Sequence, residues 1–288
     1  MRGGQRQVLL LLHGLGEAGH ECVLLARAGS PLFESAAELS HRVYPATLAN
    51  LWLRSKQADL VHAHDARAHT QAALLSRVPF VVSRRVAFPL KRSLLSQWKY
   101  RQAARFLAVS QFVAGELVRA HVARNKIDVV YDGVDNIARA GEWRADFPAV
   151  ALASSDPAKG RDLSEQSARL AHLPIKYSND LRYDLAQASM FIYITRAEGL
   201  GSAALLAMAM GIPVIASKVG GLPEALGDAG LLVDNDAAQI SAAMRRLRED
   251  SALARTLIEQ GKKRVTEKFS ARLMVEGTIQ AYRRTLAL

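Results

Sequence analysis

Apolar residues along the chain gather in short runs that alternate with helix-forming or polar stretches. The runs are rich in β-branched and aromatic residues and are bounded by turns, which is typical of buried strands. They cover residues 21–26, 58–63, 79–83, 104–110, 127–131, 149–153, 190–195 and 214–216, and a helix-like run covers 5–12. Regular alternation of this kind predicts an α/β fold built on mostly parallel, doubly wound sheets.

The chain is predicted to divide near residue 140. After Asp132–Asp135 it becomes loop-like, with Gly141, Pro148 and Pro157 around the start of a new strand. We therefore expect an N-terminal domain at 1–140 and a second domain at 141–268. Residues 237–288 read as basic helices, of which 269–288 form the last.

Composition excludes several classes of protein. The 288 residues are 50% hydrophobic and 23% charged, which suits a globular chain with room for two modest domains. The single Cys22 excludes an internal disulfide, and we expect no metal site because Cys and His do not cluster. No run approaches the ~20 apolar residues that span a bilayer, and the N-terminus does not resemble a signal peptide. We expect a cytoplasmic protein, with peripheral association at the inner face of the membrane as a further interpretation.

Positive charge is concentrated in the first half. The net charge is +11, and residues 1–135 carry 18 Lys and Arg against 10 Asp and Glu, a balance of +8. Residues 90–106 are the densest part and predict an amphipathic basic helix. It could dock on anionic lipid headgroups, bind nucleic acid, or pack on its sheet with a solvated outer face. Low aromatic content argues against nucleic acid.

A glycine turn between a buried strand and a helix is the strongest candidate site. Glu198-Gly-Leu-Gly201 interrupts the run at 190–195, and Ser202 begins an Ala/Leu/Met helix. The free amides at such a helix start suit an anion, phosphate above all. Gly199, Leu200, Gly201 and Ser202 are therefore predicted to contact a phosphate-bearing ligand.

Polar residues also follow two predicted strands of the first domain. His62 and His64 alternate along the strand at 58–63, so they should share one face, either at a ligand crevice or as partly buried structural histidines. Arg84 and Arg85 follow the next strand, and either could contact a phosphate or an acceptor. Adjacent residues of an extended chain cannot both point into one pocket, so at least one should be structural.

The segment from Thr195 to Glu224 resembles the signature of family 4 retaining glycosyltransferases of the GT-B fold. Its Glu-Gly-x-Gly turn, small-residue helix, Gly-x-Pro-Val and Gly-Gly-x-Pro-Glu all match. The resemblance implies two Rossmann-like domains that face a cleft, with the 269–288 helix crossing back to the first domain. It also implies a nucleotide-sugar co-substrate and no metal cofactor.

Several residue roles follow from this resemblance. Glu198 takes the place of the carboxylate that contacts the donor sugar, and His64 that of a histidine beside the sugar. Lys159 matches a lysine that neutralises the leaving diphosphate, and Ser155 or its neighbour Ser154 would hydrogen-bond a phosphate where the family has Arg. The family's second carboxylate, which holds the ribose, is replaced by Leu206.

The start of the chain departs from the family. Gly3-Gly4 looks like the first glycine loop, which implies donor binding, but the strand expected before it is missing. Loss of a central strand would expose apolar surface, so we expect rearrangement, a homodimer or a membrane contact.

The implied reaction is transfer of a sugar, with retention of configuration, to a hydroxyl of a glycan or lipid-linked acceptor, as in cell-envelope polysaccharide or lipopolysaccharide synthesis. Glu198, His64 and Lys159 would be its catalytic residues. The alternative is a non-catalytic relative that acts as a scaffold or regulatory subunit at the membrane. An epimerase or phosphorylase on a related fold is a third interpretation.

Overall fold

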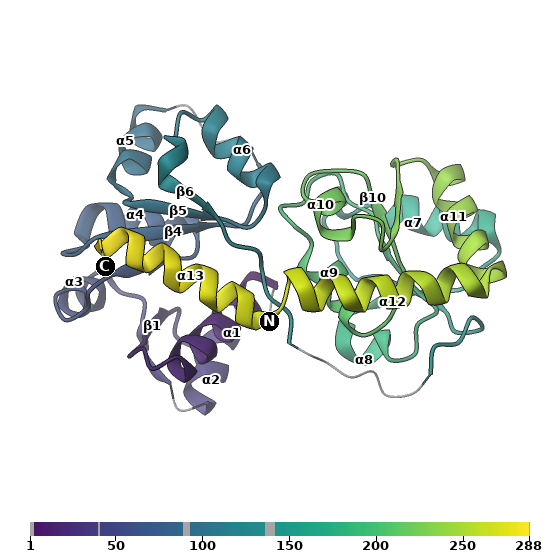
Figure 1. Ribbon diagram of the computed structural model, residues 1–288, viewed down its shortest axis with the longest axis horizontal. Helices are drawn as coiled ribbons and strands as arrows, with labels where there is room; N and C mark the ends of the chain where they lie inside the picture. The colour runs from purple at the N-terminus through teal and green to yellow at the C-terminus, as the bar shows by residue number, and fades with distance from the viewer. Residues whose placement is uncertain (1–2, 40, 89–92, 136–141, 288) are drawn as a thin grey trace. The chain divides into compact units, whose positions relative to one another are not determined.

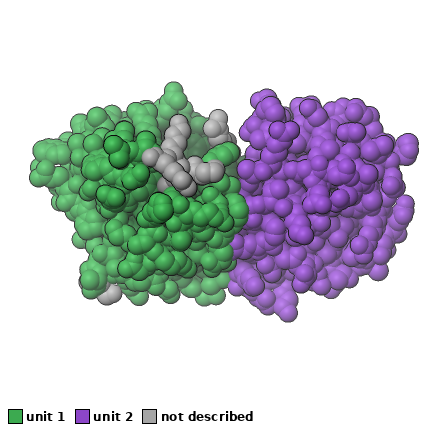
Figure 2. Space-filling model, turned by 90° about the horizontal axis from the view of Figure 1, so that it is seen from above, with its two compact units in different colours: residues 1–133, 271–288 green, residues 134–270 purple. Residues whose placement is uncertain are grey.

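A computed structural model describes residues 3–39, 41–88, 93–135 and 142–287, which form two compact α/β units. Unit 1 comprises 1–133 and 271–288, and unit 2 comprises 134–270 (Figure 2). The expected divisions lay near 140 and 268. All ladders within the sheets are parallel, and the units are Rossmann-like, as the alternation of apolar runs predicts.

The described residues of unit 1 form two separate parallel sheets (Figure 1). Strands β1 and β2 pair with each other, and the other sheet has the order β3-β4-β5-β6. The elements are α1 (Gly3–Glu17), β1 (Val23–Ala26), α2 (Pro31–Glu38), β2 (Arg42–Pro45), α3 (Leu48–Ser55), β3 (Val61–Ala63), α4 (Ala66–Leu75), β4 (Phe80–Arg84), α5 (Leu94–Gln102), β5 (Arg105–Ala108), α6 (Gln111–Arg119), η1 (Arg124–Lys126), β6 (Ile127–Val129) and α13 (Ala271–Leu286).

The divided sheet of unit 1 is covered by helices of the same chain. Val8 and Leu12 of α1 pack on Leu24 and Ala26 of β1, and a second group of buried residues joins α1 to α13. That second group contains Leu11, Leu15, Met274 and Val275. Helices of the same chain thus cover apolar surface of this sheet.

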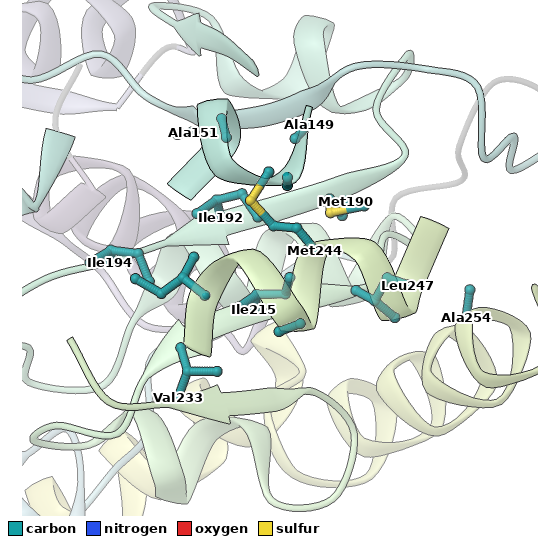
Figure 3. Packing of buried hydrophobic residues seen from close by; sticks show 14 of the residues in the cluster. Ala149, Ala151, Met190, Ile192, Ile194, Ile215, Val233, Met244, Leu247 and Ala254 are labelled. Atoms are coloured by element: carbon teal, nitrogen blue, oxygen red, sulfur yellow. The ribbon is translucent and has the colours of Figure 1, made fainter. Parts of the chain in front are cut away.

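Unit 2 contains one five-stranded sheet with the order β11-β10-β9-β7-β8. Its elements are β7 (Ala149–Leu152), η2 (Pro157–Lys159), α7 (Arg161–Ala171), β8 (Ile175–Ser178), α8 (Leu181–Leu185), β9 (Met190–Tyr193), α9 (Ser202–Ala209), β10 (Val214–Ser217), α10 (Leu222–Leu226), β11 (Leu231–Val233), α11 (Ala237–Glu249) and α12 (Ser251–Lys268). Figure 3 shows Met244 and Leu247 of α11 packed over Ile192 and Ile215 on one face of this sheet. A sheet buried on both faces explains why β9 and β10 read as continuous apolar runs.

The prediction of one helix over 90–106 is wrong at its C-terminal end. The helix α5 ends at Gln102, and Arg105 and Phe106 belong to β5, where Phe106 is fully buried. Residues 90–92 lie outside the described part of the chain. The burial gained by Phe106 in the sheet outweighs any amphipathic helix pattern that included it.

Candidate functional site

The strand order of unit 2 creates a crevice between β7 and β9. From β7 the chain goes to β8 on one side and then returns to β9 on the other, so the loops after β7 and β9 diverge. Ligands of open parallel sheets bind at such switch points, beyond the carboxyl ends of the strands. The loops concerned are 153–160 and 194–201, which contain the predicted Ser155, Lys159 and Glu198–Gly201.

A pocket of about 450 Å³ opens at this switch point. It includes the predicted Ser155, two carboxylates and two guanidinium groups. The lining residues are Ser154, Ser155, Asp156, Pro157, Gly160, Arg161, Asp162, Leu163, Ile194, Thr195, Arg196 and Asn235. Sequence reasoning missed Arg161 and Arg196. Among the described residues, the exposed Arg196 guanidinium has no hydrogen-bond or ion-pair partner, so it is available to an anionic ligand.

Two helices begin at the crevice without a side-chain cap. Gly160 precedes α7 and Gly201 precedes α9, and both are in the left-handed region, with φ of 60° and 107°. A Cβ on Gly160 would lie 2.6 Å from Ile194 Cγ2, so glycine is required there for space as well as conformation. By contrast, Thr47, Asp65 and Ser110 cap α3, α4 and α6 with their side chains. The first-turn amides of α7 and α9 are therefore left for an anion.

The structure brings Glu198 and Lys159 together. Lys159 Nζ donates to Glu198 Oε2 at 3.2 Å, and the amide of Gly199 donates to Glu198 Oε1 at 2.9 Å. The hydroxyl of Tyr193 also donates to Glu198 Oε2. The carboxylate is thus fixed by three donors and only 16% exposed, ready to accept from a ligand hydroxyl without reorienting.

Tyr193 is a further residue that sequence reasoning missed. It is buried at the end of β9, and burial together with the Glu198 carboxylate raises its pKa well above the ordinary value, so the hydroxyl stays protonated. A signal was present, because a tyrosine within a buried apolar run needs a partner for its hydroxyl.

Gly220 and Gly221 pack closely against the backbone of the Glu198 turn. The amide of Gly221 donates to the Glu198 carbonyl oxygen at 3.0 Å. A Cβ on Gly220 would collide with that oxygen, and one on Gly221 with the carbonyl oxygen of Gly199. Close backbone approach, which only glycine permits here, fixes the position of the candidate sugar-binding carboxylate.

A buried polar network closes the floor of the pocket. Thr195 N donates to Ser217 Oγ at 2.9 Å, Ser217 Oγ donates to Asn235 Oδ1 at 2.6 Å, and Asn235 Nδ2 donates to Thr195 O at 3.0 Å. This network joins the ends of β9, β10 and β11. Leu206, in contrast, is a buried residue of α9 and belongs to the core.

In unit 1 the predicted His64 and Arg85 meet Asp132 beyond the carboxyl ends of β3, β4 and β6. Arg85 Nη1 lies 3.2 Å from His64 Nδ1, and Arg85 Nε donates to Asp132 Oδ1 at 2.9 Å. Because arginine only donates, His64 Nδ1 accepts and its proton is on Nε2. Burial, with help from His62 and Arg85, holds the pKa of His64 well below 6.5, so it is neutral near pH 7.

His62 and His64 share one face of β3, as their alternation predicts. Their ring centroids are 3.9 Å apart. His62 Nδ1 lies 2.7 Å from the Tyr282 hydroxyl and its Nε2 lies 2.8 Å from Ser83 Oγ. Burial and the charge of Arg85 lower the pKa of His62 to about 3. His62 is thus a structural link between β3, β4 and α13.

Arg84 and Arg85 take different directions, as expected for neighbours in a strand. Arg84 Nη2 donates to the carbonyl oxygen of Phe88 at 2.7 Å, whereas Arg85 joins His64 to Asp132. Only Arg85 therefore belongs to the strand-end cluster of unit 1.

The interpretation of Gly3-Gly4 as a loop is wrong, because both begin the helix α1. One turn later, Gln7 exchanges hydrogen bonds with Gly133, which follows Asp132: Nε2 donates to the Gly133 carbonyl at 2.8 Å, and Oε1 accepts from its amide at 3.0 Å. The start of α1 is thus tied to the strand-end cluster. A Cβ on Gly4 would meet nothing within 4 Å, so its close surroundings do not require glycine.

None of the described helices is long and apolar enough to cross a bilayer. The described His, Cys, Asp and Glu side chains also include no group of three or more that is arranged to hold a metal ion.

Comparisons with known proteins agree with this architecture. O-antigen chain mannosyltransferase B of Escherichia coli is 41% identical over 110 residues, which are 36% of this chain and 27% of that protein. An uncharacterized glycosyltransferase of Methanocaldococcus jannaschii, MJ1178, is 25% identical over 272 residues, 80% of this chain and 76% of its own. The chain spans less than a third of the length of several relatives that it matches at higher identity.

Solved structures and family models extend the likeness over most of the chain. Anabaena HepE, crystallised with UDP and glucose, superposes with a TM-score of 0.84 at 15% identity and covers 98% of this chain and 96% of its own. That likeness shows the GT-B fold. The model for Glycosyltransferase Family 4 matches residues 1–136, and the model for Glycosyl transferases group 1 matches 114–250. The chain belongs to the family 4, group 1 glycosyltransferases.

Proposed function

We propose that this protein transfers a sugar from a nucleotide-sugar donor to a hydroxyl group of a glycan or lipid-linked acceptor, with retention of anomeric configuration. The observation that carries the proposal is the switch-point crevice of unit 2. At the ends of β7 and β9 it combines a pocket lined by Arg161, Arg196 and the uncapped start of α7 with the paired Glu198 and Lys159 and the uncapped start of α9 on the same loops. The names of relatives, among them an O-antigen mannosyltransferase and a capsular polysaccharide glycosyltransferase, favour an acceptor in a surface polysaccharide.

The leaving diphosphate would bind where the positive groups gather. First-turn amides of α7 and α9 and the guanidinium groups of Arg161 and Arg196 provide donors of fixed direction. Lys159 is paired with Glu198, but an ammonium group has three protons and can hold a phosphate oxygen at the same time. Stabilisation of the negative charge that develops on this leaving group is the main electrostatic task of the reaction.

Glu198 would accept hydrogen bonds from hydroxyls of the donor sugar. Tyr193, Lys159 and the Gly199 amide hold it in place, so orientation costs little entropy at the moment of transfer. His64 of unit 1 carries its proton on Nε2 and can donate one hydrogen bond to an oxygen acceptor.

The bond changes need no nucleophile from the protein. The acceptor oxygen bonds to the anomeric carbon as the bond from that carbon to the phosphate oxygen breaks, and the acceptor proton passes to the departing phosphate. Attack on the same face as the leaving group gives retention. The protein supplies position and charge.

One observation favours a non-catalytic scaffold as the second candidate. Leu206 occupies the place of the family's ribose-binding carboxylate and is buried in the core of unit 2. A chain without that contact would hold a nucleotide less tightly. The two candidates therefore differ in whether the pocket binds a donor at all.

A thermal-shift panel of UDP-, GDP- and ADP-sugars separates the two. A donor present at about 100 times its Kd should stabilise the protein by ~2.7 kcal/mol. Stabilisation by one donor that is lost in Lys159→Ala and kept in the control Lys263→Ala supports the donor site, since Lys263 lies exposed on α12. Glu198→Gln should then bind the donor nucleotide but lose most of the transfer. If no donor stabilises the native chain, the scaffold is favoured.

A further inference from the structure

The first turn of α5 exposes apolar side chains instead of burying them. Leu94 is 84% exposed and Leu95 69%, and no residue of this helix is buried. Trp98 follows at spacings of four and three, so the three side chains lie on one face of the helix. We call this group the α5 cluster. Helices of globular proteins normally turn such a face to the core, so an outward one indicates an interaction surface.

Basic side chains lie next to the α5 cluster. Arg101 is three residues beyond Trp98, on the same face and one turn further. Lys126 reaches the C-terminal end of the helix, where its Nζ donates to the Ala103 carbonyl at 3.2 Å. Neither α5 nor α4, which packs on it, contains an Asp or Glu. Apolar and cationic groups are thus side by side, with an indole between them.

The segment around the α5 cluster carries nearly all of the chain's net charge. Residues 61–126 contain 12 Lys and Arg and 2 Asp and Glu, a net +10 within a total of +11. An anionic partner is therefore favoured. Aliphatic side chains at the tip, a tryptophan at the boundary and cations behind it match the layers of an anionic bilayer surface better than an acidic protein.

We propose that the α5 cluster docks on the surface of an anionic lipid bilayer. Leu94 and Leu95 enter the boundary between headgroups and acyl chains, Trp98 lies at headgroup level, and Arg101 and Lys126 face lipid phosphates. Docking of this kind does not depend on sugar transfer, so the two proposals can fail separately. Its value for the proposed function would be to keep unit 1 near acceptors held at a membrane.

Flotation of the full chain with lipid vesicles tests the proposal. Binding to vesicles of phosphatidylcholine mixed with phosphatidylglycerol should be at least about tenfold stronger than binding to phosphatidylcholine alone, and should weaken as salt is raised. The double variant Leu94→Ser/Leu95→Ser should lose about tenfold of the binding to the anionic vesicles. Serine is well tolerated in the first turn of a helix, and neither leucine is buried, so the melting temperature should not change.

Matched controls define the outcomes. Leu170→Ser removes an exposed leucine of unit 2, and Arg255→Glu reverses an exposed charge on α12; both should bind as the native chain does. Arg101→Glu should weaken binding to anionic vesicles only. Equal binding of the native chain and the leucine variant would overturn the proposal. So would a dimer in sedimentation velocity without lipid that the leucine variant abolishes, because the α5 cluster would then join two copies.

Discussion

At the strand ends of unit 2, backbone amides and guanidinium groups face an open pocket, whereas at the strand ends of unit 1 the polar side chains bond to one another. Arg196 is exposed at the pocket, but Arg85 is held between His64 and Asp132. The two polar clusters therefore have different uses. The cluster of unit 2 leaves the Arg196 guanidinium exposed to a ligand, whereas in unit 1 the charges of Arg85 and Asp132 are paired with each other.

The sheets that carry the two clusters also differ, in whether they are continuous. Unit 2 places its cluster on one continuous five-stranded sheet, and unit 1 divides its strands between two sheets. Side-chain bonds in unit 1, such as the one between His62 and Tyr282, join segments that the sheet itself does not. We infer that removing a polar group from unit 1 harms folding first, whereas removing one from unit 2 harms ligand binding first.

The largest expected effect on folding is that of Asp132→Asn in unit 1. The Arg85 and Asp132 side chains are 14% and 9% exposed, so the variant leaves a nearly buried guanidinium without its charge partner. The free energy of unfolding should fall by about 3 kcal/mol in urea titration. Glu276→Gln, which removes half of an exposed pair with Arg272, should cost about 0.5 kcal/mol or less. A loss for Asp132→Asn no larger than the control would remove the contrast.

Two glycine-to-alanine variants, one in each unit, compare how strictly the backbone of each unit requires glycine. Gly221→Ala places a Cβ against the Gly199 carbonyl oxygen, so the Glu198 turn must move. The free energy of unfolding should fall by about 2 kcal/mol, and the affinity for the donor should fall as well. Gly4→Ala meets open space in the first turn of α1 and should be neutral or stabilise by about 0.5–1 kcal/mol. Thermal melts with and without donor measure both. Loss of donor binding in Gly4→Ala would show that Gly4 contributes to donor binding, as the family resemblance implies, although it lies in a helix.

Acid should weaken unit 1 through its buried histidines. The pKa of His62 is about 3 when folded and near 6.5 when unfolded, so the unfolded chain binds the proton first. The stability this gives is complete above pH 6.5 and is lost as the pH falls towards 3, by up to about 1.4 kcal/mol for each pH unit. His62→Gln should make the fall in unfolding free energy between pH 6.5 and 5 less steep than in the native chain. His64, Arg85, Ser83 and Tyr282, which face His62, are unchanged in that comparison. Parallel curves would show that His62 is not buried in the neutral state.

The polar residues of unit 2 are easier to predict from the sequence than those of unit 1. In unit 2 the determinants are local: glycines at a strand-to-helix turn and Glu198 beside them are read directly, and the structure places them as predicted. In unit 1 the partner of His64 is Arg85, which follows β4 and bonds in turn to Asp132 after β6, and the partners of His62 come from β4 and α13, all far away in sequence. No local pattern identifies such pairs. Gly3-Gly4 shows the opposite error, since a local pattern suggested a loop where tertiary contacts of Gln7 and the apolar face of α1 hold a helix.

The smallest expected effect tests whether the Glu198 cluster is built for catalysis or only for packing. Tyr193→Phe keeps the buried ring and removes one donor to the carboxylate, while Lys159 and the Gly199 amide remain. If Glu198 positions the donor sugar, the variant should keep its melting temperature within a few degrees and lose about tenfold in kcat/KM. Tyr183→Phe is the matched control, because Tyr183 lies exposed on α8, away from the Glu198 turn. Equal kinetics for the two phenylalanine variants would mean that Tyr193 only fills space. A loss of stability without a kinetic effect would mean that this cluster, like that of unit 1, serves the fold.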